Sequence, residues 1–138
     1  MALAKKTLTD ATLPDLQSRE GRSALARMVV KLLDLWGLST SDQAALLGLS
    51  PASRSTLARY RRGEPLADSR DLVDRAGHLL GIHKSLRILF PENPDLARRW
   101  PTTPNRRLSG RTPVALMRAG GFEGVLAVRR YLDFERGR

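Results

Sequence analysis

The sequence contains no cysteine, and aromatic residues make up only 5% of its 138 residues. Disulfides and thiolate-based zinc or redox sites are therefore excluded. Because 41% of the residues are nonetheless hydrophobic, the core must consist mainly of Leu, Val and Ala, which suits packed helices. No apolar run approaches the ~18 residues that a membrane span needs, and the opening MALAKKTLTD is too short and polar for a secretion signal. We expect a cytoplasmic protein with no membrane partner.

Acidic residues are outnumbered, since 14 Asp and Glu stand against 24 Lys and Arg, for a formal net charge of +10. Both parts of the chain share the excess. Residues 18–64 hold eight basic and four acidic residues, and residues 65–138 hold fourteen basic and eight acidic residues. Such a charge favours a polyanionic partner, most simply nucleic acid. Charge alone leaves DNA, RNA and an acidic protein open.

Apolar residues recur at helical spacing along most of the chain. In residues 20–36, for example, Leu25, Met28, Val29 and Leu32 follow the i, i+3, i+4, i+7 rule. Similar patterns predict helices at 40–47, within 51–62, from Asp68 to Phe90 with an interruption at Gly81, from Asn93 to Trp100, at 113–119 and at 122–133. No stretch alternates Val or Ile with polar residues, so the predicted fold class is all-α.

Two of the short helices, joined through Gly48, form a helix-turn-helix pattern. Residues 40–47 would cross the DNA backbone, and the helix within 51–62 would enter the major groove. Ser50 and Pro51 suit the N-cap and first position of this second helix. With Leu57 and Tyr60 turned toward the core, its opposite face points outward.

The outward face supplies the candidate DNA-binding residues, which are Ser53, Arg54, Ser55, Arg59, Arg61 and Arg62. Arg54 and Arg59 suit bidentate contacts to guanine, each worth ~1–3 kcal/mol of discrimination. The two serines suit phosphate or base hydrogen bonds, and Arg61 and Arg62 suit phosphate attraction. A basic solvated helix in a small bundle is the alternative, but a run of arginines without an acid favours DNA.

The stretch TPNRRLSGRTPVALM, residues 103–117, reads as a stiff turn followed by a helix. Thr112 suits an N-cap and Pro113 a first helical position. Asn105 suits a turn, and Gly110 suits a backbone position with positive φ. These local roles leave the arginines of the turn pointing outward without an explanation.

Two segments resemble known families. LSTSDQAALLGLS and SRSTLARYRRG resemble Xre-type helix-turn-helix domains, except that Pro51-Ala52-Ser53 adds three residues between Gly48 and Leu57. Either the recognition helix begins a turn early or the turn is enlarged. PNRRLSGRTPVALMRAGGFEGVLAVRRYL resembles the toxin-binding domain of the Xre/MbcA/ParS antitoxins, and it matches their pattern at Pro104, Asn105, Leu108, Gly110, Arg111, Thr112, Pro113, Leu116 and Gly120.

The resemblance implies a type II antitoxin whose partner is a RES-domain toxin, an enzyme that acts on NAD. Antitoxins of this family cover the toxin's active site with the C-terminal region and bind their own operator DNA, usually as dimers. The domains expected on this basis are an N-terminal arm over 1–17, a helix-turn-helix domain over 18–65 and a toxin-binding domain with a C-terminal tail over 66–138.

The toxin-binding candidates that follow are Arg106, Arg111, Met117, Tyr131, Leu132, Phe134, Glu135, Arg136 and Arg138, and the scaffold candidates are Asn105, Gly110, Thr112 and Pro113. In a dinucleotide site the tail could present a carboxylate in place of pyrophosphate, or an arginine to an acidic catalytic residue. Both remain open, as does a frayed terminus at 134–138.

The sequence offers little for catalysis. His78 and His83 are five residues apart, which is not the i, i+4 spacing of a helical metal pair. No nucleophile elbow or dinucleotide loop is present, so we expect no enzymatic activity, no cofactor and no metal. The competing functions are a free-standing transcriptional regulator whose C-terminal half dimerises, and a small basic RNA- or ribosome-associated protein.

Overall fold

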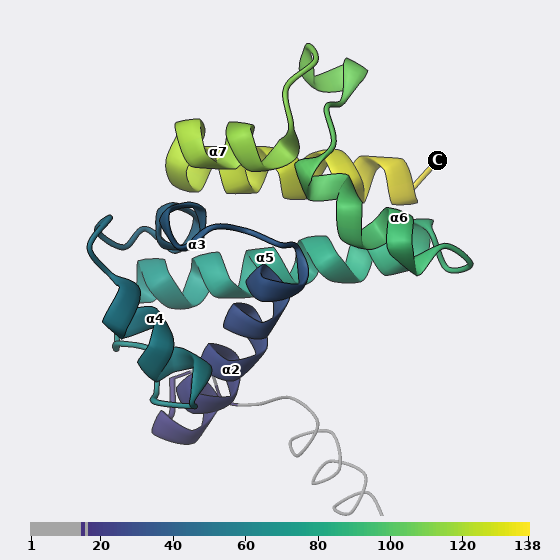
Figure 1. Cartoon of the computed structure of the whole chain (residues 1–138). Helices are drawn as coiled ribbons and strands as arrows, with labels where there is room; N and C mark the ends of the chain where they lie inside the picture. The colour runs from purple at the N-terminus through teal and green to yellow at the C-terminus, as the bar shows by residue number, and fades with distance from the viewer. Residues whose placement is uncertain (1–14, 16) are drawn as a thin grey trace, which may run out of the picture.

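Figure 1 shows the computed structural model of the chain, which describes residue 15 and residues 17–138. Its α-helices are α2 (Arg19–Leu35), α3 (Thr40–Leu47), α4 (Arg54–Arg61), α5 (Arg70–Leu89), α6 (Pro94–Arg99) and α7 (Pro113–Arg136), and two 3-10 turns, η1 (Trp100–Thr102) and η2 (Arg106–Leu108), connect α6 to α7. No strand occurs among these residues, and the all-α prediction is confirmed. Most of the predicted arm, residues 1–14 and 16, lies outside the described part.

Helix α5 crosses the middle of the molecule and packs against α2 on one side and α7 on the other (Figure 1). Helix α3 also contacts α7, and α4 lies against α2. The buried side chains, from Leu25 to Leu132, form one cluster that is mostly Leu, Val and Ala. A single core therefore runs through both halves of the chain, with the composition that the scarcity of aromatic residues predicts.

Side-chain caps fix where most of the helices begin. Ser39 and Asn93 accept hydrogen bonds from the first turns of α3 and α6. The helix predicted from Asp68 begins at Arg70, because Ser69 caps it and accepts a hydrogen bond from the Leu72 amide at 3.3 Å.

The predicted interruption at Gly81 is also wrong, since α5 runs unbroken through it. Gly81 instead makes room for a neighbour. A Cβ at this position would lie 2.6 Å from the Arg129 guanidinium carbon of α7. The glycine therefore serves close packing between α5 and α7 and does not end a helix.

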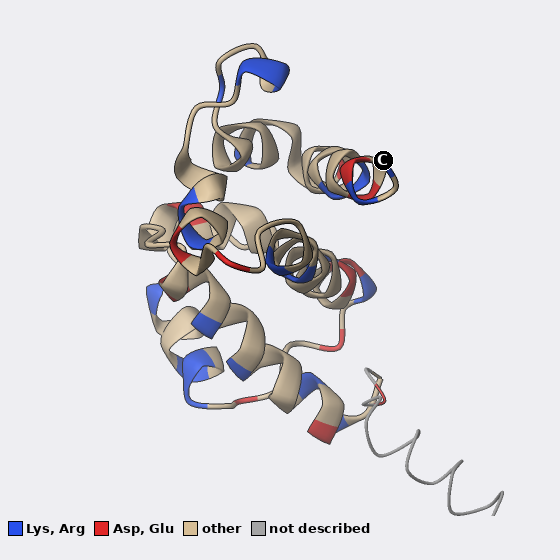
Figure 2. Ribbon diagram, turned by 90° about the vertical axis from the view of Figure 1, so that its right-hand side faces the viewer, with Lys and Arg blue, Asp and Glu red and all other residues tan. Residues whose placement is uncertain are grey.

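Helix α7 is bent at Gly121, whose φ of 60° and ψ of −141° are not helical. The halves at 113–120 and 122–136 fold back on one another and lie side by side in Figures 1 and 2. Gly124 permits this approach, because a Cβ there would lie 2.5 Å from the Leu116 carbonyl oxygen. The two helices predicted at 113–119 and 122–133 are present as this hairpin, and the second extends to Arg136.

Candidate functional site

The turn between α3 and α4 decides how the second helix is presented. Gly48 ends α3 with a φ of 72°, and α4 begins only at Arg54. Pro51 therefore does not start the helix as predicted, and residues 51–53 lie in the turn. Of the two alternatives for the additional residues, the structure has the enlarged turn.

Helix α4 presents the face that its sequence predicts. Leu57 and Tyr60 are buried in the core, whereas Arg54, Ser55, Arg59 and Arg62 are exposed. The Tyr60 hydroxyl accepts a hydrogen bond from the Ala67 amide at 3.3 Å, which ties the helix to the segment after it.

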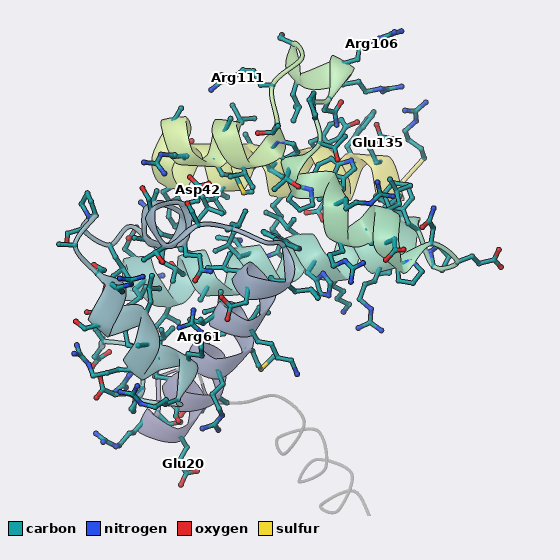
Figure 3. All side chains as sticks on the ribbon, viewed as in Figure 1. Glu20, Asp42, Arg61, Arg106, Arg111 and Glu135 are labelled. Atoms are coloured by element: carbon teal, nitrogen blue, oxygen red, sulfur yellow. The ribbon has the colours of Figure 1, made fainter. Side chains whose placement is uncertain are left out.

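Two candidate DNA-binding residues are placed differently from the prediction. Ser53 is only 8% exposed, and its hydroxyl lies 3.3 Å from that of Ser50, so it stabilises the turn instead of facing a partner. Arg61 donates to both carboxylate oxygens of Asp34 in α2, at 2.8 and 3.0 Å. This hydrogen bonding lowers the pKa of Asp34 and raises that of Arg61. Arg61 (Figure 3) thus holds α4 against α2 and is committed within the chain.

Arg59 is exposed but not free. Its Nε lies 2.9 Å from the Glu64 carboxylate, with the two side chains 45% and 50% exposed. The pair orients the guanidinium on the outward face, and it places a negative charge where phosphate would come. To bind DNA, Arg59 must break its ion pair with Glu64 and contact a base or a phosphate instead.

The arginine-rich loop before α7 is closed by Asn105. The Asn105 side chain accepts from the Arg107 amide at 2.9 Å. Its backbone amide donates to the Arg111 carbonyl at 3.0 Å, and its carbonyl accepts from the Gly110 amide at 2.9 Å. Gly110 has the predicted positive φ, 80°. The residue thus joins both ends of the loop.

Helix α7 begins as the sequence predicts. The Thr112 hydroxyl accepts from the Ala115 amide at 3.0 Å, and Pro113 is the first helical residue. Arg106 and Arg111 project from the loop, away from the helical body (Figure 3). The scaffold candidates therefore have the local geometry expected of them, and the loop they build displays its arginines to solvent.

The C-terminal tail is a helix end that contacts its own chain. Tyr131 stacks on Trp100, with ring centroids 6.3 Å apart and planes 10° from parallel. Glu135 lies 3.3 Å from Arg107 of the loop. Arg136 donates to the hydroxyl of Ser85 at 3.2 Å. Burial first, and then the Glu135 carboxylate, raises the pKa of Tyr131. Residues 134–136 are the last residues of α7.

The toxin-binding candidates divide by exposure. Phe134 is 66% exposed, and Arg138 is also on the surface. Met117 and Leu132 are 0% and 1% exposed, so the prediction that they face a partner is wrong. Each lies on the inner side of the α7 hairpin, where helical spacing places it in the core.

One contact that the sequence did not reveal joins the two halves of the chain. Arg118 of α7 forms an ion pair with Asp42 of α3 and donates to the Ser41 hydroxyl at 3.0 Å. The two residues are 76 positions apart, and no pattern of spacing connects them.

Figure 2 shows basic residues at both ends of the molecule, on the loop before α7 and along α2 and α4.

The histidines have structural surroundings. His78 Nδ1 lies 2.9 Å from an Arg129 nitrogen, and burial, followed by the charge of Arg129, lowers the pKa of His78. Burial likewise lowers the pKa of His83. Within the described residues, no group of three or more acidic or His side chains is arranged to hold a metal ion. Nor does any helix there have the length and hydrophobicity to cross a membrane.

Comparison with known proteins agrees with this geometry. Residues 15–81 match the antitoxin Xre-like helix-turn-helix domain, and residues 85–138 match the antitoxin Xre/MbcA/ParS C-terminal toxin-binding domain. The chain belongs to the Xre/MbcA/ParS antitoxin family. This antitoxin is also 37% identical over 107 residues to the uncharacterized protein y4oB of Sinorhizobium fredii. The aligned residues make up 78% of this chain and 80% of y4oB. The two matched regions meet inside α5.

Proposed function

We propose that this antitoxin neutralises a RES-domain toxin that consumes NAD, and that it represses its own operon by binding operator DNA as a homodimer in the cytoplasm. We propose no catalytic role for the chain itself. One observation carries the proposal. An exposed basic helix lies at one end of the molecule, and an arginine loop beside an exposed helix end lies at the other, inside the region that matches a toxin-binding domain.

The toxin-binding surface that we propose consists of the exposed loop and the end of α7. Arg106 and Arg111 provide two guanidinium groups on a loop that Asn105 holds rigid. Phe134 provides the apolar anchor, because it is the most exposed of the large apolar side chains described. Arg138 extends from the same end. This surface also includes Tyr131, Glu135 and Arg136. They must give up their present contacts within the chain before they can contact the toxin.

We propose that the end of α7 covers the toxin's active site. Truncation of the C-terminus tests this, and the burial of Leu132 determines which residues can be removed. Removing residues 131–138 would also remove Leu132 from the core, so the chain should end after Asp133. We expect this truncated chain to keep its fold and operator binding, and to lose protection of cells that express the toxin from the neighbouring gene.

The matched point variant is Phe134→Ser, which removes the anchor without shortening the chain. Circular dichroism and thermal unfolding check that both variants are folded, and a mobility shift on the upstream DNA checks that α4 is intact. Protection by the chain that ends at Asp133 would contradict the role of the tail. A neighbouring gene that encodes no toxin would contradict the proposed partner, and would favour a free-standing regulator.

Operator binding is proposed to use Arg54, Ser55, Arg59 and Arg62 on the outer face of α4. We expect Arg59→Ala to weaken binding to the chain's own upstream DNA by about 5-fold to 150-fold, since a bidentate arginine contributes ~1–3 kcal/mol. Arg70→Ala is the control, because this arginine is exposed but lies on α5. Unchanged sequence-specific binding by Arg59→Ala would show that this residue does not read the operator.

A further inference from the structure

An apolar groove lies between α2, the C-terminal half of α5, and α6. Met28 and Leu35 line it from α2, and Ile88 lines it from α5. These three side chains are 50%, 45% and 47% exposed, and only Phe134 among the large apolar side chains described is more exposed than all of them. Leu80 and Phe90 complete the apolar lining. Contiguous exposed apolar surface of this kind marks an interaction site in a soluble chain.

Helical spacing places the apolar side chains of the groove on one face of each helix. Met28 and Leu35 are seven residues apart on α2, which is two turns. Leu80, Lys84 and Ile88 are four apart on α5 and form one row along the helix. Helices α2 and α5 cross in Figure 1, so a straight segment that follows the row on α5 meets Met28 and Leu35 at its side. An amphipathic helix has this shape.

The charge of the groove is of one sign. Lys84, Arg87 and Arg98 line it, and none of the described lining residues is acidic. Arg98 is paired with Asp95, whereas no ion pair involves Lys84 or Arg87 within the described residues. Two unpaired cations beside an apolar floor favour carboxylates on the flanks of whatever binds there.

We propose that this groove binds an acidic amphipathic helix of a partner protein, with large apolar side chains on one stripe and Asp or Glu on its flanks. A second copy of the chain facing the groove with the same surface would bring the unpaired cations of both copies into one interface, which like-charge repulsion disfavours. The site is separate from the loop and helix end assigned to the toxin above. It rests on the groove alone and does not depend on that assignment.

The test is a titration of the full chain with fluorescein-labelled helical peptides of about 15 residues, followed by fluorescence anisotropy. One peptide carries Leu at i, i+3, i+4 and i+7 with Glu between, and the matched peptide carries Lys in place of Glu. We expect the Glu peptide to bind saturably and at least about tenfold more tightly than the Lys peptide. Ile88→Ser should weaken this binding by about tenfold or more, and Ala in place of Leu in the peptide should do the same.

The decisive variant reverses the charge of the groove. Lys84→Glu combined with Arg87→Glu should invert the preference, so that the Lys peptide binds more tightly. Arg70→Glu is the matched control on the same helix, because its side chain is 93% exposed and lies outside the groove. Lys84→Glu alone serves if the double variant does not unfold cooperatively on heating.

Three results would overturn the proposal. The first is equal binding of the two peptides, and the second is binding that Ile88→Ser leaves unchanged. The third is a dimer in sedimentation that Ile88→Ser converts to a monomer, because a second copy would then cover the groove.

Discussion

Arg118 in α7 pairs with Asp42 in α3 and so joins the toxin-binding domain to the first helix of the helix-turn-helix (Asp42 is labelled in Figure 3). Asp42 also donates its backbone amide to Ser39, the cap of α3, at 3.1 Å. We therefore expect a partner that moves the first half of α7 to act on the N-terminus of α3, the helix before α4. The two regions recognised by separate family models are physically coupled at this point.

The strength of this coupling is measurable by a double-mutant cycle of Arg118→Ala and Asp42→Ala in urea unfolding. The side chains are 47% and 31% exposed, so we expect a coupling free energy of about 0.5–1 kcal/mol. Arg70 and Asp74 supply the matched pair, since they are 3.8 Å apart and 93% and 46% exposed. Their cycle should give a coupling close to zero. Additive effects at Arg118 and Asp42 would mean that the ion pair does not hold the domains together.

Glu64→Gln tests whether the ion pair at Arg59 opposes DNA binding. The substitution removes a carboxylate that lies 2.9 Å from the arginine and that phosphates would repel. We expect operator affinity to rise by up to about fivefold, the limit that an exposed ion pair of ~0.2–1 kcal/mol allows. Weaker binding in the mobility shift would instead show that Glu64 positions the guanidinium for its contact.

Asp34→Asn tests the attachment of α4 to α2. The pKa of Asp34 is lowered in the folded chain, chiefly by the hydrogen bonds from Arg61. Its stabilising contribution is therefore present above the pKa of the unfolded chain, and it is lost as pH falls through the lower folded value. We expect the variant to be less stable at neutral pH and to lose less stability than wild type on acidification. Unfolding measured from pH 7 down to pH 3 checks this, and parallel curves for the two proteins would contradict it.

The same ion pair shows where sequence reasoning stops. Leu57 and Tyr60 could be placed in the core, and Ser55, Arg59 and Arg62 outside it, because helical periodicity depends only on spacing within one helix. Periodicity carries no information about a partner 27 residues away, so it predicts a phosphate contact for Arg61 and does not reveal the pairing with Asp34. Pairing between distant helices is decided by their packing.

Predictions from glycine positions fail for a similar reason, because glycine can serve a turn, a close contact or a helix interior. Gly48 and Gly110 have the positive φ that a turn requires, and local sequence predicts both. Gly81 is helical and leaves room for Arg129, so a local breaker rule fails there. The prediction of Met117 as a contact residue fails for a related reason. The hairpin that buries it depends on a fold-back at Gly121 whose direction the sequence does not specify.

The α7 hairpin can be tested by replacing three of its glycines with alanine. At Gly124 a Cβ would lie 2.5 Å from the Leu116 carbonyl oxygen, so the alanine must push the halves apart, and we expect a loss of ~1–3 kcal/mol. Gly121→Ala should cost a similar ~1–3 kcal/mol for a different reason, since its φ of 60° and ψ of −141° suit glycine alone.

Gly120→Ala is the control, because a Cβ there has nothing within 4 Å and its φ is not positive. We expect this variant to be as stable as wild type or up to about 1 kcal/mol more stable, since alanine favours helix. Thermal unfolding monitored by circular dichroism at 222 nm ranks the three. The geometry requires Gly120→Ala to be more stable than the other two variants. If Gly124→Ala matched Gly120→Ala, the two halves of α7 would not be in the contact that buries Met117.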